Sequence, residues 1–161
     1  MKRAFTLIEL IFVIVIIGLL ASFAVPKFTN LTKHAKNANI KSIVTSVQSS
    51  IDNIHGKWII NDTYKWDPDG DGNDNLNSEG YPTSLDSGKG EIKLFKYVLK
   101  TPVYACANKS NGCWEEYDDN KYEYNYSSSK ALRIDYNTTN GTLECVDGVG
   151  VTKAECEELI Y

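Results

Sequence analysis

The sequence lacks the short motifs that mark the common enzyme classes. It contains no G-x-S-x-G, no Walker loop, no dinucleotide-binding fingerprint and no H-E-x-x-H. Histidine is scarce, since only His34 and His55 occur in 161 residues, and neither has a recognisable nucleophile and carboxylate near it in sequence. We therefore expect a protein that is not an enzyme and that uses no organic cofactor.

Basic charge is also in short supply. The chain has 17 Lys and Arg against 21 Asp and Glu, which gives a formal net charge of −4. Nucleic-acid-binding domains usually carry a basic surface, so no nucleic-acid partner is indicated. The composition, 42% hydrophobic and 24% charged, excludes wholesale disorder, a collagen-like fibre and a polytopic membrane protein. The length suits one compact domain with an appendage.

One stretch, residues 5–25, is nearly free of charge, and its single charged residue is Glu9. Its 21 residues in a helix, at about 1.5 Å each, cover the roughly 30 Å hydrocarbon core of a bilayer. A secretory signal peptide is the alternative, because residues 22–24 offer a small-x-small cleavage pattern that would leave Val25 first. Glu9 argues against it, because a carboxylate inside an apolar run costs roughly 2.5–3.5 kcal/mol and so usually has a partner or a function. The alternative is that Glu9 lies near the membrane edge, where it can snorkel or become protonated without a partner.

The first residues, Lys2 to Ile11, and the apolar run behind them resemble the processing and methylation signal of type IV pilins and type II secretion pseudopilins. The resemblance covers about the first 30 residues. It implies that prepilin peptidase cuts between Ala4 and Phe5 and that Phe5 is then N-methylated. Glu9 and Pro26 match a glutamate and a helix-bending proline of the family. Ala4 departs from it, because glycine normally precedes the cleaved bond.

The family resemblance gives Glu9 a role in assembly. After cleavage, its carboxylate can neutralise the cationic amine of Phe5 in a neighbouring subunit within an apolar bundle. Removing one partner of a buried pair costs about 3–5 kcal/mol, so this pair would set the register of the subunits.

After Pro26, apolar residues recur every three or four positions, which predicts an amphipathic helix over residues 26–58. With the membrane segment this makes one helix of about 50 residues, roughly 75 Å long, that ends near Gly56. The predicted apolar stripe consists of Phe28, Leu31, Ala35, Ala38, Ile43, Val47, Ile51, Ile54 and Trp58.

Residues 59–161 are predicted to form a soluble domain. Alternating apolar positions between Trp114 and Val146, separated by turn residues, predict an antiparallel meander. Residues 91–100 show helical spacing and are expected to form a short helix, and Thr152-x-x-Glu155 is a capping box that can start a terminal one. The predicted fold class is therefore α+β and pilin-like: a long N-terminal helix, membrane-spanning in its first half, packed on a small antiparallel sheet.

An Asp-rich stretch reproduces the first half of an EF-hand-like calcium loop. Oxygen ligands alternate and Gly72 follows where such a loop turns sharply, but position 12 is Ser78 instead of the bidentate Glu, with Glu79 adjacent. We predict a weak calcium site, with a solvated acidic turn as the alternative. The candidate ligands are Asp67, Asp69, Asp71, Asn73 and Asn75.

The four cysteines are not paired as C-x2-C, and beside an export-type N-terminus they predict two disulfides. Three connectivities are possible, of which Cys106–Cys113 with Cys145–Cys156 is the most local. Asn125 and Asn137 lie in N-x-S/T sequons that follow an acidic residue, so both are candidate glycosylation sites, although chance matches are expected in an Asn-rich sequence.

These features together predict a structural subunit, a major or minor pilin, of a type IV pilus or related filament. Its expected partners are other pilins, prepilin peptidase, the assembly machinery and the bacterial inner membrane. We expect a single-pass protein with an exported C-terminal domain that later enters the filament. A type II secretion pseudopilin is the first alternative, and a secreted or membrane-anchored calcium-dependent binding domain is the second.

Overall fold

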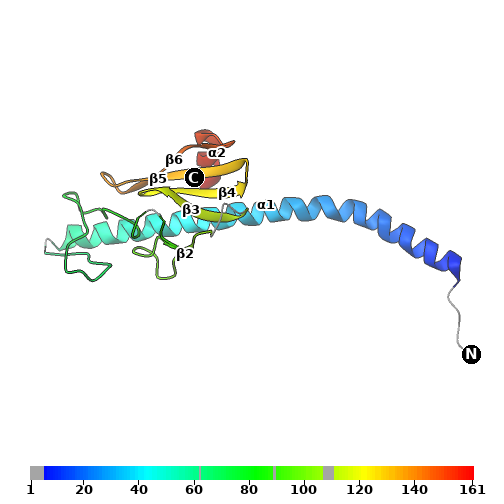
Figure 1. Cartoon of the computed structure of the whole chain (residues 1–161), viewed down its shortest axis with the longest axis horizontal. Helices are drawn as coiled ribbons and strands as arrows, with labels where there is room; N and C mark the ends of the chain where they lie inside the picture. Colours follow the sequence, from blue (N-terminus) through cyan, green and yellow to red (C-terminus); the bar gives the residue numbers. More distant parts are fainter. Residues whose placement is uncertain (1–5, 62, 89, 107–110) are drawn as a thin grey trace, which may run out of the picture. The chain divides into compact units, whose positions relative to one another are not determined.

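The computed structural model describes residues 6–61, 63–88, 90–106 and 111–161, and the chain divides into two compact units, Met1–Ala38 and Asn39–Tyr161. One helix, α1 (Leu7–Ile60), contributes to both units. The described part of the second unit also contains six strands and a second helix, α2 (Lys153–Ile160) (Figure 1). The predicted α+β fold class is confirmed.

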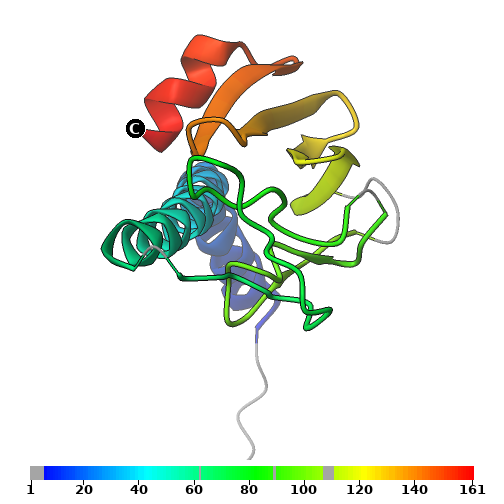
Figure 2. The same ribbon diagram turned by 90° about the vertical axis from the view of Figure 1, so that its left-hand side faces the viewer.

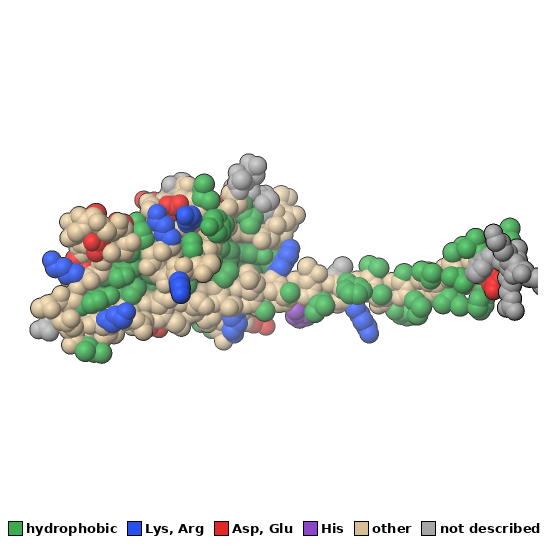
Figure 3. Space-filling model, turned by 90° about the horizontal axis from the view of Figure 1, so that it is seen from below, with side chains coloured by type: hydrophobic (Ala, Val, Ile, Leu, Met, Phe, Trp, Pro, Cys, Tyr) green, Lys and Arg blue, Asp and Glu red, His purple; other side chains and the backbone are tan. Residues whose placement is uncertain are grey.

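In the first unit, the apolar part of α1 is not covered by any described residue. Its large apolar side chains, from Leu7 to Val25, are between 40% and 75% exposed. Figure 3 shows these side chains on the surface of the helix (green). By length and composition this helix can cross a membrane. Pro26 lies inside the helix, as the sequence predicts, at a position where the backbone has no N–H to donate to the preceding turn.

In the second unit, α1 buries one face against the sheet. The predicted stripe is only partly right: Val47, Ile51 and Ile54 are buried, but Ile40 and Val44, which also lie on this face, were missed. Phe28 and Leu31 are exposed within the first unit. The predicted stripe includes Ile43, which is half-buried, in place of the neighbouring Val44, which is buried.

The helix also runs further than predicted, to Ile60 instead of Gly56. A glycine inside a helix costs about 1 kcal/mol, which tertiary packing can offset. Trp58, beyond the glycine, packs so closely on the backbone of Gly80 that a Cβ built on Gly80 would lie 2.2 Å from the indole Cδ2. This contact stabilises the last turn, so Gly56 does not end the helix.

The main sheet is an antiparallel meander, as predicted, with strand order β3-β4-β5-β6. Its strands are β3 (Cys113–Asp118), β4 (Lys121–Ser127), β5 (Lys130–Asn137) and β6 (Thr142–Val149). The inner face packs on α1, and α2 lies beside β6 (Figure 2). The buried hydrophobic side chains of the inner face are Trp114, Tyr122, Tyr124, Leu132, Ile134, Tyr136, Leu143 and Cys145.

The short helix predicted over residues 91–100 is wrong. The chain instead forms β1 (Lys93–Leu94), which pairs with β2 (Val103–Tyr104), and then turns sharply at Phe95, whose φ is 56°. The Phe95 N–H donates to Oδ2 of Asp86 at 3.2 Å, and the buried ring contacts Tyr122 with centroids 4.2 Å apart. These long-range contacts outweigh the local helical spacing.

Two further expectations, the capping box and the disulfide connectivity, are confirmed. The capping box is present, since Thr152 accepts from the Glu155 N–H and the Glu155 carboxylate accepts from the Thr152 N–H. The disulfides have the most local connectivity, Cys106–Cys113 and Cys145–Cys156. The second joins β6 to α2 inside the core.

Candidate functional site

The first candidate site is the start of α1. The predicted processing residues Ala4 and Phe5 lie outside the described residues, but Glu9 is described and exposed. Its Oε2 accepts from the backbone N–H of Thr6 at 3.5 Å and from the Thr6 hydroxyl at 3.3 Å, while the Glu9 N–H donates to that hydroxyl. This is capping-box geometry, which satisfies N–H groups at the helix start.

The surroundings of Glu9 are apolar. The same side of the helix presents a hollow lined by Thr6, Ile8, Glu9, Ile11, Phe12 and Val15. The hydrogen bonds to Thr6 are long, and a carboxylate has about four acceptor positions. The carboxylate can therefore accept a further cationic donor, and burying this surface without such a donor would leave the charge uncompensated.

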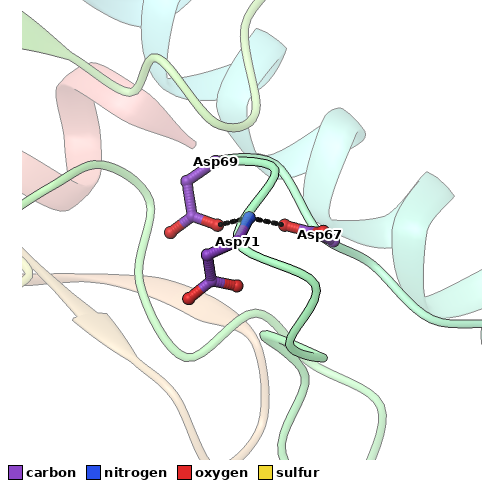
Figure 4. A group of neighbouring side chains, drawn as sticks. All are labelled: Asp67, Asp69 and Asp71. Atoms are coloured by element: carbon purple, nitrogen blue, oxygen red, sulfur yellow. Dashed lines mark hydrogen bonds between the residues drawn. The ribbon is translucent and has the colours of Figure 1, made fainter.

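The second candidate site is the acidic loop, shown in Figure 4. Oδ1 of Asp67 accepts from the N–H groups of Gly70 and Asp71 at 2.7 and 3.2 Å, and Oδ2 accepts from the Gly72 N–H at 2.9 Å. These backbone donors, that of Gly72 foremost, hold the pKa of Asp67 below its ordinary value. The loop is therefore wrapped around one ionised carboxylate.

The three aspartates are brought together as predicted. Asp67, Asp69 and Asp71 each offer an oxygen within 4.8 Å of the others, and all three residues are exposed. Gly72, with φ +86°, supplies the sharp turn. Three carboxylates this close repel one another, and a hard cation with oxygen ligands would relieve that repulsion.

The two asparagines of the predicted ligand set behave differently. The side-chain amide and the backbone N–H of Asn73 both donate to the Asp71 carboxylate at 2.8 Å. Asn75 is held through its backbone, which donates to the Trp66 carbonyl and accepts from the Thr83 N–H. Asn73 thus orders the carboxylates, and Asn75 joins the loop to the domain.

The two sequon asparagines differ in accessibility. Asn125 is only 5% exposed, on β4. Asn137 is half-buried at the end of β5, where its amide donates to Oε1 of Glu144 at 3.0 Å. Glycosylation therefore stays a prediction for Asn137, while the burial of Asn125 disfavours it there.

Sequence reasoning missed a pair of buried carboxyl groups, Asp86 and Glu116. Burial raises the pKa of Asp86, which accepts from the N–H groups of Gly88 and Phe95 and from the Tyr122 hydroxyl. Burial, followed by the charge of Asp86, raises the pKa of Glu116 to about 7. The sequence feature that could have revealed the burial of Glu116 is the strand alternation, because it places Glu116 on the same inner face as Trp114.

Comparison with known proteins bears on the helix start. Residues 1–25 match the family model of the prokaryotic N-terminal methylation motif. The chain carries a prepilin-type methylation motif. It is homologous to the type IV narrow pilus major component PilA5 of Thermus thermophilus, with 50% identity over 48 residues, or 30% of this chain and 41% of that relative. The match thus spans about two fifths of the relative's length. No solved structure matches the chain.

The motif confirms the family resemblance inferred from the first residues. Within the motif, Glu9 lies at the start of α1 and is followed by an uninterrupted apolar helix. The prepilin-type motif and this helix together suit a protein that is first held in a membrane.

Proposed function

We propose that the chain is a non-enzymatic structural subunit, a major or minor pilin, of a type IV pilus or related filament. The observation that carries the proposal is the prepilin-type motif directly followed by a helix whose apolar side chains lack any intramolecular cover among the described residues. Apolar area gains about 25 cal/mol per Å² when it leaves water, so this surface needs lipid or other subunits. The same surface serves in the membrane before assembly and in the filament core after it.

Processing would begin at the cytoplasmic side of the inner membrane. Prepilin peptidase would remove residues 1–4 and leave an N-methylated Phe5, whose amine stays cationic. Glu9 of a neighbouring subunit would then accept this amine, because the apolar surroundings of Glu9 make an unpaired carboxylate costly. Pro26 would bend the helix beyond this contact.

The C-terminal domain would be exported. Both disulfides support this localisation, because disulfides form and persist in oxidising compartments such as the bacterial periplasm. The protein would therefore be a single-pass inner-membrane protein before it enters a filament in the periplasm or at the cell surface.

The deciding experiment is the N-terminus and intact mass of the protein isolated from its native membrane. A chain that begins at methylated Phe5, with four hydrogens lost to two disulfides, is the expected result. A chain that begins at Val25 would contradict the proposal, because the apolar helix would then be a discarded signal. In that case the second alternative, a secreted binding domain, would apply.

The pseudopilin alternative shares the processing step and needs a different measurement. Deleting the gene in its native host should remove surface fibres seen by electron microscopy if the chain is a pilus subunit. Loss of exported enzymes with intact fibres would instead favour a type II secretion pseudopilin.

We further propose that the acidic loop binds calcium weakly. The wrapping of the loop around Asp67 supports it, because the backbone turn is already formed and the oxygens of Asp69 and Asp71 are exposed. Calcium should raise the melting temperature of the wild type, and Asp69→Asn with Asp71→Asn should abolish the rise. Asp118→Asn, outside the loop, is the control. Absence of any rise in the wild type would overturn this proposal.

A further inference from the structure

Four lysines on α1 have no acidic partner among the residues that the structure describes. We call Lys27, Lys33, Lys36 and Lys41 the basic collar. The segment from Pro26 to Lys41 contains no Asp or Glu. Lys27, Lys33 and Lys41 are exposed and Lys36 is half-buried, and none belongs to an ion pair among the described parts of the chain.

The collar lysines point to different sides of the helix. Successive residues of an α-helix are about 100° apart, so Lys27 and Lys41 fall within about 40° of each other. By the same rule Lys33 lies about 80° from Lys41 and about 60° from Lys36, so the four lysines spread over about half of the helix circumference. A flat partner would meet only part of this arc. Neighbours packed around the helix would meet all of it.

The rest of the chain carries the opposite charge. From Ser42 to Tyr161 there are 11 basic and 20 acidic residues, a formal charge of −9. One exposed part of this excess lies on β6 and α2, which pack together and are joined by the Cys145–Cys156 disulfide. We call it the acidic surface, and it consists of Glu144, Asp147, Glu157 and Glu158.

The acidic surface has few cations of its own. Lys153 is the single basic residue between Thr142 and Tyr161, and its Nζ lies 3.7 Å from Oε1 of Glu157. Both side chains of this pair are about half exposed, so solvent screens the pair. Glu158 has no ion-pair partner within the ranges that the structure covers.

Anionic lipid headgroups are the competing partner for the collar, but the length of the helix disfavours them. If the membrane span ends at Val25 and the helix leaves along the bilayer normal, Lys41 lies about 24 Å beyond that end. Charges are screened over about 8 Å at physiological ionic strength. The bilayer can therefore attract Lys27 but not Lys36 or Lys41, whereas a neighbouring copy can reach all four.

We propose that the basic collar of one subunit binds the acidic surface of neighbouring copies of the same chain. This inference rests on the proposed function, because neighbours stand beside the collar only in an assembly. Packing of the apolar helices holds the subunits together. The charges favour the axial shift between subunits that places the collar of one copy against the acidic surface of another.

Charge exchange tests the proposal in the native host. Lys36→Glu with Lys41→Glu should lower the yield of sheared filaments about tenfold, as should Glu157→Lys with Glu158→Lys. Combining all four changes should restore most of the yield. The matched control adds Glu79→Lys and Asp118→Lys to the lysine reversals, which makes the same change in net charge at exposed positions outside the acidic surface and should not restore the yield. Equal membrane levels of all variants exclude a folding defect.

A second measurement does not depend on variants. A carbodiimide, which joins amines to carboxylates in direct contact, should link collar peptides to acidic-surface peptides in the dimer band of wild-type filaments. The same link in the monomer band would overturn the proposal, because the contact would be intramolecular.

The outcomes separate the two proposals. Wild-type filaments without these links, with no rescue by the combined variant, overturn this inference and leave the proposed function standing. If the lysine variant instead loses binding to phosphatidylglycerol vesicles and assembles normally, the lipid is the partner and the inference is wrong. A wild type that is processed at Val25 and forms no filament overturns both.

Discussion

The hydroxyl of Tyr122, on β4, donates a hydrogen bond to Oδ2 of Asp86 at 3.0 Å, and both side chains are at most 1% exposed. Asp86 also accepts from the N–H groups of Gly88 and Phe95, so one carboxylate organises the loop between residues 84 and 99. Tyr122 is the donor that joins this loop to the sheet.

Replacing Tyr122 with Phe should destabilise the domain by about 1–3 kcal/mol, because it leaves a buried carboxylate short of a donor. The aromatic packing on Phe95 would be retained. Chemical denaturation of the purified soluble domain measures the loss. Tyr104→Phe, at a position that is 63% exposed, is the control and should change stability little. Equal stabilities of the two variants would contradict the role given to Tyr122.

Glu116 should make stability depend on pH. Its pKa is raised from 4.5 to about 7 in the folded state, mainly by burial, so the folded state holds a proton that the unfolded chain has already released. The contribution of Glu116 to stability should be greatest below about pH 4.5 and fall by about 1–3 kcal/mol as the pH rises to about 7.

Glu116→Gln isolates this contribution, because glutamine can still accept from the Asn120 N–H but does not titrate. The measurement is the wild-type minus variant difference in unfolding free energy between pH 4.5 and pH 8. Other carboxyl groups, such as Asp67 and Glu91 with lowered pKa, act in the opposite direction and cancel in the difference. A pH-independent difference would contradict the prediction, and Glu158→Gln is the surface control.

Gly80→Ala should destabilise the domain by more than about 2 kcal/mol, because the new Cβ would lie 2.2 Å from the Trp58 indole and φ is +79°. Gly70→Ala is a matched control, since its φ is +77° and no atom lies within 4 Å of the added Cβ. The two variants share the backbone strain, so the difference in their melting temperatures measures the steric contact. An equal loss of stability in the two variants would contradict the prediction, because it would mean that the Trp58 side chain moves away from the new Cβ without an energetic cost.

The two disulfides should contribute unequally. Removing Cys145–Cys156 by serine substitution should cost about 2–4 kcal/mol, because it frees α2 and places hydroxyl groups in the core. Removing Cys106–Cys113, whose cysteines are half-buried and close a shorter loop, should cost less. Denaturation of the two double variants provides the comparison, and an equal or reversed order would count against this account of the core.

Glu9→Ala should leave membrane insertion intact and impair assembly, because insertion needs only the apolar run, whereas the proposed assembly requires the carboxylate to accept the Phe5 amine. Membrane fractionation should find the variant at the wild-type level, and sheared filaments should be strongly depleted. Glu79→Ala, in an exposed turn, controls for loss of charge alone. A normal filament yield from Glu9→Ala would contradict the assembly role.

Much of the fold could be predicted from the sequence where the signal is local. The meander followed from alternation and turn residues, the α2 cap from Thr152 and Glu155, and the aspartate cluster from the spacing of Asp67, Asp69 and Asp71. Each of these depends on residues close together in the chain, so its pattern is visible without the fold.

The predictions from sequence were wrong where contacts between residues far apart in the chain determine the conformation. The chain turns at Phe95 because the Phe95 N–H donates to Asp86 and its ring packs against Tyr122. Helix α1 continues beyond Gly56 because Trp58 packs on Gly80. The buried Asp86 and Glu116 were missed for the same reason, since polar side chains are normally expected outside. Their burial becomes apparent only when the loop and the sheet are placed together.

The strand order of the meander has a consequence for how the domain reaches its native state. Each strand of the main sheet pairs only with strands next to it in the sequence, so every hairpin can close over a short stretch of chain. Such short-range contacts favour fast folding. A chain that is synthesised from its N-terminal end can therefore build the sheet hairpin by hairpin. The contacts of Gln48 with Gly141 and Leu143, 93 and 95 residues apart in the chain, can form only at the end, when the finished sheet closes onto the helix.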